Sequence, residues 1–284
     1  MTADPIKTAV VDGYARIARA SQSAPFAELF ACCTPGDAAP TDTARRVAQT
    51  VGYTEADLDA APEGSNLGVG CGNPVALSRI EAGDTVLDLG SGAGFDCFLA
   101  AQHVGASGRV IGVDLGDEML ALARKNAEAC GLDNVTFVQG DIEDVPLESD
   151  SVDRVISNCV INLAPDKPRV FAEAHRVLRD GGSFHISDIV LTGEIPDEIR
   201  NSEAGLIACI SGAARLDDYL QYAEAAGFTD VRVDTETDFP LELILTDPVA
   251  QRVLADLRLN AEQVEEIRSS VKSISMSGTK GETG

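Results

Sequence analysis

An apolar run, a glycine-rich turn and a helical pattern follow one another between Val86 and Phe98, where the chain is VLDLGSGAGFDCF. The apolar start is typical of a buried strand, and Gly90, Gly92 and Gly94 come next. The periodic stretch Phe95–Ala101 then predicts a helix. A strand, a glycine turn and a helix in this order are typical of the start of a doubly wound α/β domain. Its glycines let the backbone approach a ligand, and the helix N-terminus offers free N–H groups.

Two carboxylates narrow the choice of ligand. A dinucleotide-binding turn needs its third glycine one position later, where this chain has Phe95. Asp88 stands two residues before the first glycine, so it would repel a pyrophosphate but suits a ligand with an ammonium group or hydroxyl groups. Asp114 ends the next apolar run and suits a ribose diol, because one carboxylate can accept from both hydroxyls. The pattern predicts S-adenosylmethionine (SAM) rather than NAD. The alternative is a glycine turn with a purely structural role.

Strand and helix patterns alternate through the rest of this region. Strands are expected at residues 85–89, 109–113, 135–138, 152–157 and 184–189. Alternation of this kind indicates a parallel sheet with right-handed crossovers, and ligands bind at the carboxyl ends of its strands. Asp88, Asp114, Asp141 and Asn158 all fall at such ends. Their convergence from four strands supports one binding site better than any single motif does.

The remaining patterns divide the chain into four parts. Residues 1–60 are expected to form a helical cap, 61–190 the SAM-binding domain, and 191–274 a C-terminal α+β extension. Within the extension we expect strands at 231–233 and 241–245 and helices at 249–259 and 261–274. The last ten residues, 275–284, are small and polar, which is typical of a disordered tail.

The net charge is strongly negative. The chain has 22 Lys and Arg against 46 Asp and Glu, a formal net charge of −24. Nucleic acid and anionic membranes are therefore disfavoured as partners. The acidity indicates either a highly soluble surface or adaptation to high internal salt. No apolar run is long enough to span a bilayer, and the first residues lack the pattern of a secretion signal, so we expect a cytoplasmic protein.

The chain contains seven cysteines, some of which are candidate functional residues. An odd number without a CxxC motif argues against a disulfide framework or an ordinary zinc site. Cys97 and Cys130 lie on predicted helices and are expected to be packing residues. Cys159 follows the fourth strand at the binding edge, whereas Cys71 and Cys209 lie in loops on either side of the core. For Cys159, simple packing is the competing interpretation.

If these loops fold over the binding edge, three thiols meet above the sulfonium methyl group. Three thiolates without histidine or carboxylate ligands suit a soft, thiophilic centre such as trivalent arsenic. Bound arsenic keeps a lone pair and can attack the methyl group directly. An oxygen nucleophile would need a general base, and no histidine or lysine is evident at the strand ends.

Several stretches together resemble a known family. GCGNP, GFDC and NCVINL, with RVLRDGGSFHISDIV and CISGA, are similar to sequences of bacterial and archaeal arsenite methyltransferases. The resemblance covers roughly residues 61–227. It implies a class I, Rossmann-like methyltransferase fold, SAM as cofactor, and an arsenic site formed by Cys71, Cys159 and Cys209. Cys32 and Cys33 resemble an N-terminal cysteine region of the family, which implies a redox role in which the oxidised form pairs with Cys71.

From these arguments we predict a SAM-dependent methyltransferase acting on arsenite or arsenic–thiol conjugates, with glutathione or thioredoxin as reductant. The predicted cofactor residues are Asp88, Gly90, Ser91, Gly92, Gly94, Asp114, Leu115, Met119, Asp141, Ile142 and Asn158. Two alternatives stay open. One is a general small-molecule methyltransferase with structural cysteines, and the other is a metalloid-binding protein without catalytic activity.

Overall fold

A seven-stranded sheet forms the centre of the protein, in the order β3-β2-β1-β4-β5-β7-β6. The computed structural model describes residues 4–22, 40–195, 200, 209–239, 265 and 268–282. The five parallel strands are β1 (Thr85–Leu89), β2 (Arg109–Asp114), β3 (Val135–Gln139), β4 (Val152–Asn158) and β5 (Leu178–Leu191). Strand β7 (Val271–Lys280) is antiparallel to both of its neighbours, β5 and β6 (Phe228–Asp238). The predicted doubly wound, mostly parallel sheet is therefore confirmed.

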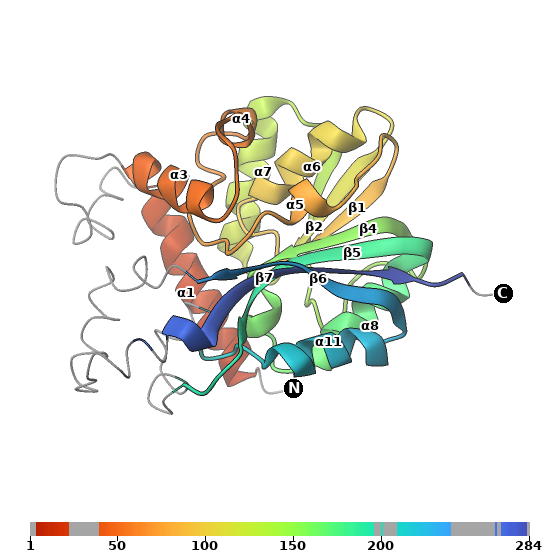
Figure 1. The fold of residues 1–284 in the computed structure, drawn as a ribbon. Coiled ribbons are helices and arrows are strands. Elements are labelled where there is room, and N and C mark those ends of the chain that lie inside the picture. Colours follow the sequence, from red (N-terminus) through yellow and green to blue (C-terminus); the bar gives the residue numbers. More distant parts are fainter. Residues whose placement is uncertain are drawn as a thin grey trace.

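Helices cover both faces of the sheet (Figure 1). On one face lie α8 (Lys167–Val177) and α11 (Leu216–Ala225); on the other lie α5 (Pro74–Leu77), α6 (Phe95–Val104) and α7 (Asp117–Cys130). Strand β1 is buried on both sides because its side chains alternate between the two cores. Val86 packs with Phe98 of α6, whereas Leu87 belongs to the core that contains Phe171 of α8.

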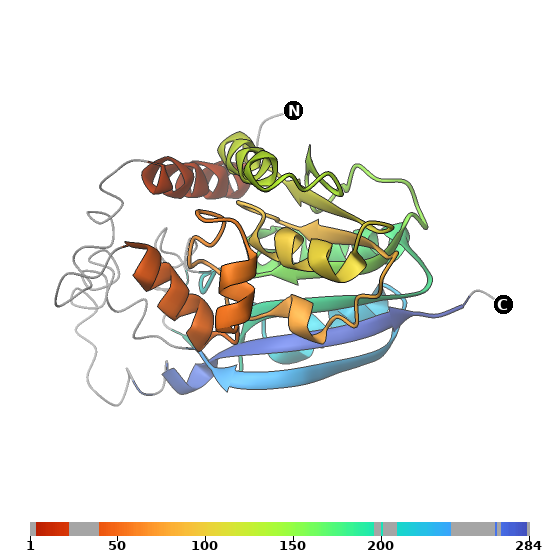
Figure 2. The ribbon, with the colours of Figure 1, turned by 90° about the horizontal axis from the view of Figure 1, so that it is seen from above.

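The N-terminal helices lie beside the sheet domain. They are α1 (Pro5–Ser21), α3 (Pro40–Thr50) and α4 (Glu55–Ala60). Elsewhere in the chain, a short 3-10 helix, η1 (Ile161–Leu163), follows β4. The side chain of Asp4 caps α1, and Thr54 and Asp57 form a capping box at the start of α4. Helix α1 lies along α7 (Figure 2). It therefore covers the carboxyl-end side of the sheet, near the expected binding edge.

The prediction of a disordered tail over 275–284 is wrong for most of that segment. Residues 275–280 belong to β7, and the helix expected over 261–274 ends before Val271, where this strand begins. The cause is a period-two pattern. Ile274 and Met276 pack into the core with Phe184, while the serines between them face the other side of the sheet.

Other expectations fall on parts of the chain that the structure does not describe. These are Cys32, Cys33, the strand at 241–245 and the helix at 249–259. Within the ranges given above, no helix is both long and apolar enough to cross a membrane.

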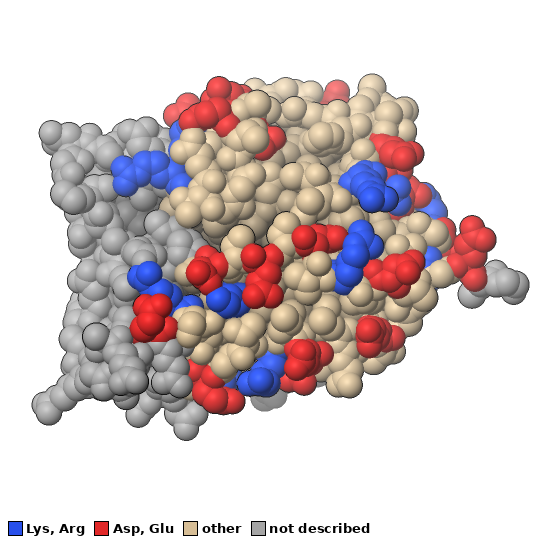
Figure 3. Space-filling model, viewed as in Figure 1, with Lys and Arg blue, Asp and Glu red and all other residues tan. Residues whose placement is uncertain are grey.

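Acidic and basic side chains lie interspersed on the face shown in Figure 3. Arg45 pairs with Asp59 at 2.7 Å, and Arg179 pairs with Asp153 at 2.6 Å. Because the whole chain has 46 acidic but only 22 basic residues, such pairs leave most of the carboxylates uncompensated. Their mutual repulsion opposes the compact state at low ionic strength.

We therefore expect the melting temperature to rise with KCl concentration, from 0.1 M into the molar range. A rise of about 5 °C or more corresponds to roughly 1–3 kcal/mol for a chain of this size. Thermal unfolding followed by circular dichroism in a KCl series measures it. A flat or falling midpoint would show that the acidic surface serves solubility alone.

Candidate active site

A cavity opens at the carboxyl ends of β1, β2 and β4, where the sequence predicts the polar residues of the binding site. Most of the residues predicted to bind the cofactor line it: Asp88, Gly90, Ser91, Gly92, Asp114, Leu115, Met119, Asp141, Ile142 and Asn158. Gly94 is not among the lining residues. Helix α1 and the loop before α5 contribute lining residues that the sequence did not single out, among them Tyr14, Leu67 and Val69.

The glycine turn brings the backbone close to its surroundings. Gly90 has φ +71°, and a Cβ added there would lie 2.3 Å from Cγ2 of Val160. Gly94 has φ +92° and would place a Cβ 2.7 Å from the ring of Phe137, so its role is close packing of α6 on the sheet. Asp114 holds the turn from the next strand, because its carboxylate accepts hydrogen bonds from the N–H groups of Gly92 at 2.9 Å and Gly116 at 2.8 Å.

Two carboxylates, one on β1 and one in the first turn of α6, are buried at the cavity. Asp88 is 2% exposed and Asp96 is 7% exposed, and both line the cavity. Burial, and then the charge of Asp96, raises the pKa of Asp88 well above its ordinary value. Burial raises the pKa of Asp96 to about 6. Within the described part of the chain, neither carboxylate forms an ion pair with a basic side chain, so a cationic ligand would relieve an unfavourable arrangement.

At the other end of the cavity, Lys7 of α1 pairs with Asp141 at 2.6 Å and also with Glu143. These pairs connect the N-terminal helix to the segment after β3. They also neutralise Asp141, the third predicted carboxylate, so this end of the cavity carries less negative charge than the end near Asp88.

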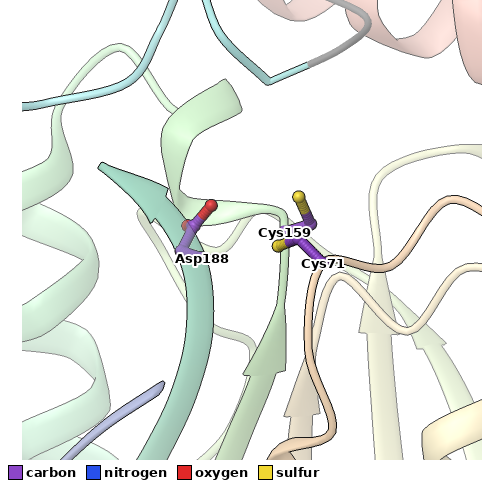
Figure 4. A group of neighbouring side chains, drawn as sticks. All are labelled: Cys71, Cys159 and Asp188. Carbon is purple, nitrogen blue, oxygen red and sulfur yellow. The ribbon is translucent and has the colours of Figure 1, made fainter. Parts of the chain in front are cut away.

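The three predicted thiols lie together in one buried cluster. Cys71, Cys159 and Cys209 are 2%, 6% and 2% exposed. The thiols of Cys71 and Cys159 and a carboxylate oxygen of Asp188 all lie within 4.8 Å of one another, around one space (Figure 4). The thiol of Cys209 donates a hydrogen bond to the carbonyl oxygen of Cys159 at 3.0 Å. Cys159 also lines the cavity, so the cluster opens onto the predicted cofactor site.

The backbone at two of these cysteines is unusual. Cys159 has φ 59° and Cys209 has φ 60°, in the left-handed region that residues other than glycine rarely adopt. Backbone strain of this kind persists where the surrounding structure fixes it, and it is concentrated at functional sites. At Cys159 the turn is held by a hydrogen bond from its N–H to the carbonyl oxygen of Ser187 at 2.9 Å.

Burial in the cluster favours the protonated form of the thiols. Burial raises the pKa of Cys71 to about 12. The hydrogen bond with Cys159, together with burial, raises the pKa of Cys209 well above its ordinary value. A ligand that binds here must therefore displace protons or bring groups that accept them.

A further residue of the site, Asp188, was not predicted from the sequence; it is a fully buried residue of β5 beside the thiols. Its carboxylate accepts from the hydroxyl of Tyr219 at 2.7 Å and from the amide side chain of Asn162 at 2.8 Å. Burial nevertheless raises the pKa of Asp188 to about 6. A carboxylate inside the apolar run FHISDIV was the signal that could have identified it, because buried charges are rare unless they have a role.

Tyr219→Phe is expected to lower the free energy of unfolding by about 1.5–3 kcal/mol, because it removes a hydrogen bond to a buried carboxylate. Urea unfolding measures the change. Tyr222→Phe is the matched control. Tyr222 lies on the same helix but is only partly buried, and we expect a change within about 0.5 kcal/mol there. Equal losses in both variants would contradict a specific contribution of the Tyr219 hydroxyl.

Strand β7 also supports the thiol cluster. The hydroxyl of Ser273 donates to the carbonyl oxygen of Cys71, and the hydroxyls of Ser187 and Ser275 lie 2.9 Å apart. Strand β7, near the end of the chain, therefore helps to hold the loop that carries Cys71.

Comparison with known proteins identifies the family. Residues 80–227, more than half of the chain, match a family described as a methyltransferase domain. The crystal structure of CrArsM, an arsenic(III) S-adenosylmethionine methyltransferase from Chlamydomonas reinhardtii, superposes with a TM-score of 0.60 at 34% identity, covering 86% of this chain and 75% of that one. The chain belongs to the arsenic(III) SAM methyltransferase family. The resemblance inferred from the motifs is thereby confirmed.

Two curated relatives in the arsenic(III) SAM methyltransferase family extend beyond the part that aligns with this chain. The arsenite methyltransferase of Halobacterium salinarum is 43% identical over 233 residues, which cover 81% of this chain but 57% of the relative. The human arsenite methyltransferase is 37% identical over 182 residues, which cover 61% of this chain and 48% of the human protein. The aligned part thus spans about half the length of these curated relatives.

Proposed function

We propose that this chain transfers methyl groups from SAM to trivalent arsenic bound by Cys71, Cys159 and Cys209. The observation that carries the proposal is the cluster of three buried thiols opening onto the cavity of a class I methyltransferase. An alcohol or amine acceptor would not require three neighbouring thiols, whereas a thiophilic centre does.

The cavity residues fit SAM. The hydroxyl of Ser91 is buried there without a hydrogen-bond partner, so it is available to a ligand. Asp88 and Asp96 provide carboxyl groups whose ionised form a positively charged amino acid end would stabilise, and Asp114 is placed to accept from a ribose diol. In this proposal Asp141 and Ile142 border the adenine. When bound, SAM supplies an electrophilic methyl group on a sulfonium cation.

Arsenite suits thiols that are protonated. Arsenous acid, As(OH)₃, condenses with three thiols to form three As–S bonds, and each thiol proton leaves with one hydroxide as water. No base on the protein is consumed. A divalent cation would instead have to release the protons of the buried thiols, including that of Cys71 with its pKa raised to about 12. The protonated cluster thus favours a metalloid hydroxide as substrate.

Arsenic bound to three sulfurs keeps its lone pair, which is the nucleophile. The As–C bond forms as the S–CH₃ bond breaks, and the cofactor sulfur keeps the electron pair. The contribution of this chain is to hold both reactants in contact and to exclude water, which lowers the entropic cost of the reaction. Cys159 is central to this, because it belongs to the thiol cluster and also lines the cavity.

Methyl transfer oxidises arsenic formally by two electrons, so a further round requires a reductant. In our proposal two thiols, from glutathione or thioredoxin, supply these electrons and form a disulfide. The cysteines Cys71, Cys97, Cys130, Cys159 and Cys209 are all free. Free thiols at the site fit a reducing compartment, and we propose the cytoplasm.

The test is an assay of purified protein with SAM, arsenite and glutathione, with the arsenic products separated by chromatography and detected by mass spectrometry. We expect methylated arsenic to appear together with S-adenosylhomocysteine, and only when SAM is present. Arsenite binding without SAM consumption would indicate a binding protein. Absence of arsenite binding would leave a methyltransferase for another acceptor.

A further inference from the structure

The cofactor cavity and the Cys71 loop are joined by three polar side chains, which we call the Asn158 network: Tyr53, Asp96 and Asn158. The Asn158 amide nitrogen donates to Asp96 at 3.0 Å and lies 2.8 Å from the hydroxyl oxygen of Tyr53. The Tyr53 hydroxyl donates to the other oxygen of Asp96 at 2.6 Å. All three residues line the cavity.

Asn158 also holds both sides of Cys71. Its side-chain oxygen accepts from the N–H of Cys71 at 3.0 Å, and its amide nitrogen donates to the carbonyl oxygen of Gly72 at 2.8 Å. A Cβ at Gly70 would lie 2.9 Å from this amide nitrogen, and one at Gly72 would lie 2.5 Å from the side chain of Ser187. The glycines around Cys71 therefore permit close approach, and the loop is clamped between β4 and β5.

The same loop forms part of the cavity wall. Leu67, Gly68, Val69 and Gly70 line the cavity immediately before Cys71. Asp96, at the far end of the network, lies beside Asp88, where the positive charge of SAM is expected. A ligand in the cavity thus touches the network at its acidic end and the Cys71 loop directly.

We propose that the Asn158 network couples the two binding events: a positively charged cofactor fixes Asp96, which orients Asn158, which holds Cys71 beside Cys159. This inference rests on the proposed function. Tyr53, Asp96 and Asn158 act here as positioning residues for the arsenic-binding thiol. Because coupling of binding free energies is reciprocal, arsenic bound at Cys71 strengthens cofactor binding by the same factor.

The experiment is isothermal titration calorimetry with arsenite, with and without saturating sinefungin, a cationic SAM analogue that has no methyl group to transfer. In the parent protein we expect sinefungin to lower the Kd of arsenite about fivefold or more, and arsenite to lower the Kd of sinefungin equally. Tyr53→Phe keeps the aromatic ring, whose centroid lies 4.9 Å from that of Phe95, but removes the hydroxyl. In this variant we expect the Kd of each ligand to change by less than about twofold when the other ligand is added. Tyr222→Phe is the control and should keep the parent ratio.

Asn158→Asp is a second, nearly isosteric variant. It keeps an acceptor for the N–H of Cys71 but loses the donor to Asp96 and Gly72, so we expect loss of coupling and weaker arsenite binding. Independent binding of the two ligands in the parent, or a parent-like ratio in Tyr53→Phe, overturns the inference but leaves the proposed function intact. If the parent binds no arsenite at all, the proposed function fails as well.

Discussion

Cys159→Ser is expected to abolish the methylation of arsenite, with a loss of about 100-fold or more in turnover. Cys159 is the thiol shared by the cluster and the cavity, and its position is fixed by the end of β4. A serine oxygen is a hard donor that bonds poorly to a soft centre, so it cannot replace the thiol. Turnover is measured with arsenite and with monomethylarsenite as substrates.

The three thiols are not expected to be equivalent. Cys209→Ser should resemble Cys159→Ser, because these two residues are directly hydrogen-bonded. Cys71→Ser should abolish turnover of arsenite but spare monomethylarsenite, which already carries one carbon and needs only two sulfurs.

The control for all three variants is Cys130→Ser, at the exposed end of α7, which should keep the parent rate. SAM binding by each variant serves as the test of folding. If Cys159→Ser methylates arsenite at the parent rate, the three-thiol site is wrong, and a methyltransferase with another acceptor becomes the better interpretation.

Asp114→Ala should weaken SAM binding by roughly tenfold or more, which corresponds to the loss of about 1.5–3 kcal/mol from a charge-assisted hydrogen bond. The structure adds a second reason for this loss. The Asp114 carboxylate also accepts from the N–H groups of Gly92 and Gly116, so its removal loosens the glycine turn itself.

Calorimetric titration of SAM without arsenite measures this affinity. Asp117→Ala is the matched control, since it removes an exposed carboxylate three residues away that does not line the cavity. An unchanged Kd in a folded Asp114→Ala variant would remove Asp114 from the cofactor site.

The parallel half of the fold was predictable because its signals are local. Strand β1 is buried on both faces, so its apolar run needs no knowledge of its neighbours, and its predicted bounds match the structure. Helix α7 also carries a local signal, since Gly131 ends it in the left-handed conformation typical of a C-terminal cap.

Strand β7 was not predictable in the same way. Its serines are polar in isolation and acquire partners only in the folded protein, as when Ser275 meets Ser187 of β5. The apolar residues between them, Ile274 and Met276, pack with Phe184, about ninety positions earlier in the chain. A local pattern of small polar residues could not reveal that contact.

In the candidate site, too, some residues were predictable from the local sequence and others were not. The cysteines and the aspartates at strand ends stood out because residue type and position agreed. Tyr53 gave no such signal, since nothing in its local sequence indicates a hydrogen bond with Asp96, which lies 43 positions later. Asp96 itself was detectable as an acidic residue within the apolar stretch FDCFLAA, on a face of α6 that is buried.

The insertion of β7 between β5 and β6 has a consequence for biosynthesis. It is the last described strand in chain order, yet β6 is paired only with it among the described strands. While the chain is emerging from the ribosome, the parallel half has its local contacts, but β5 has an unpaired edge until residues 271–280 are released. Exposed strand edges favour aggregation, so completion of the sheet competes with misassembly on every nascent chain.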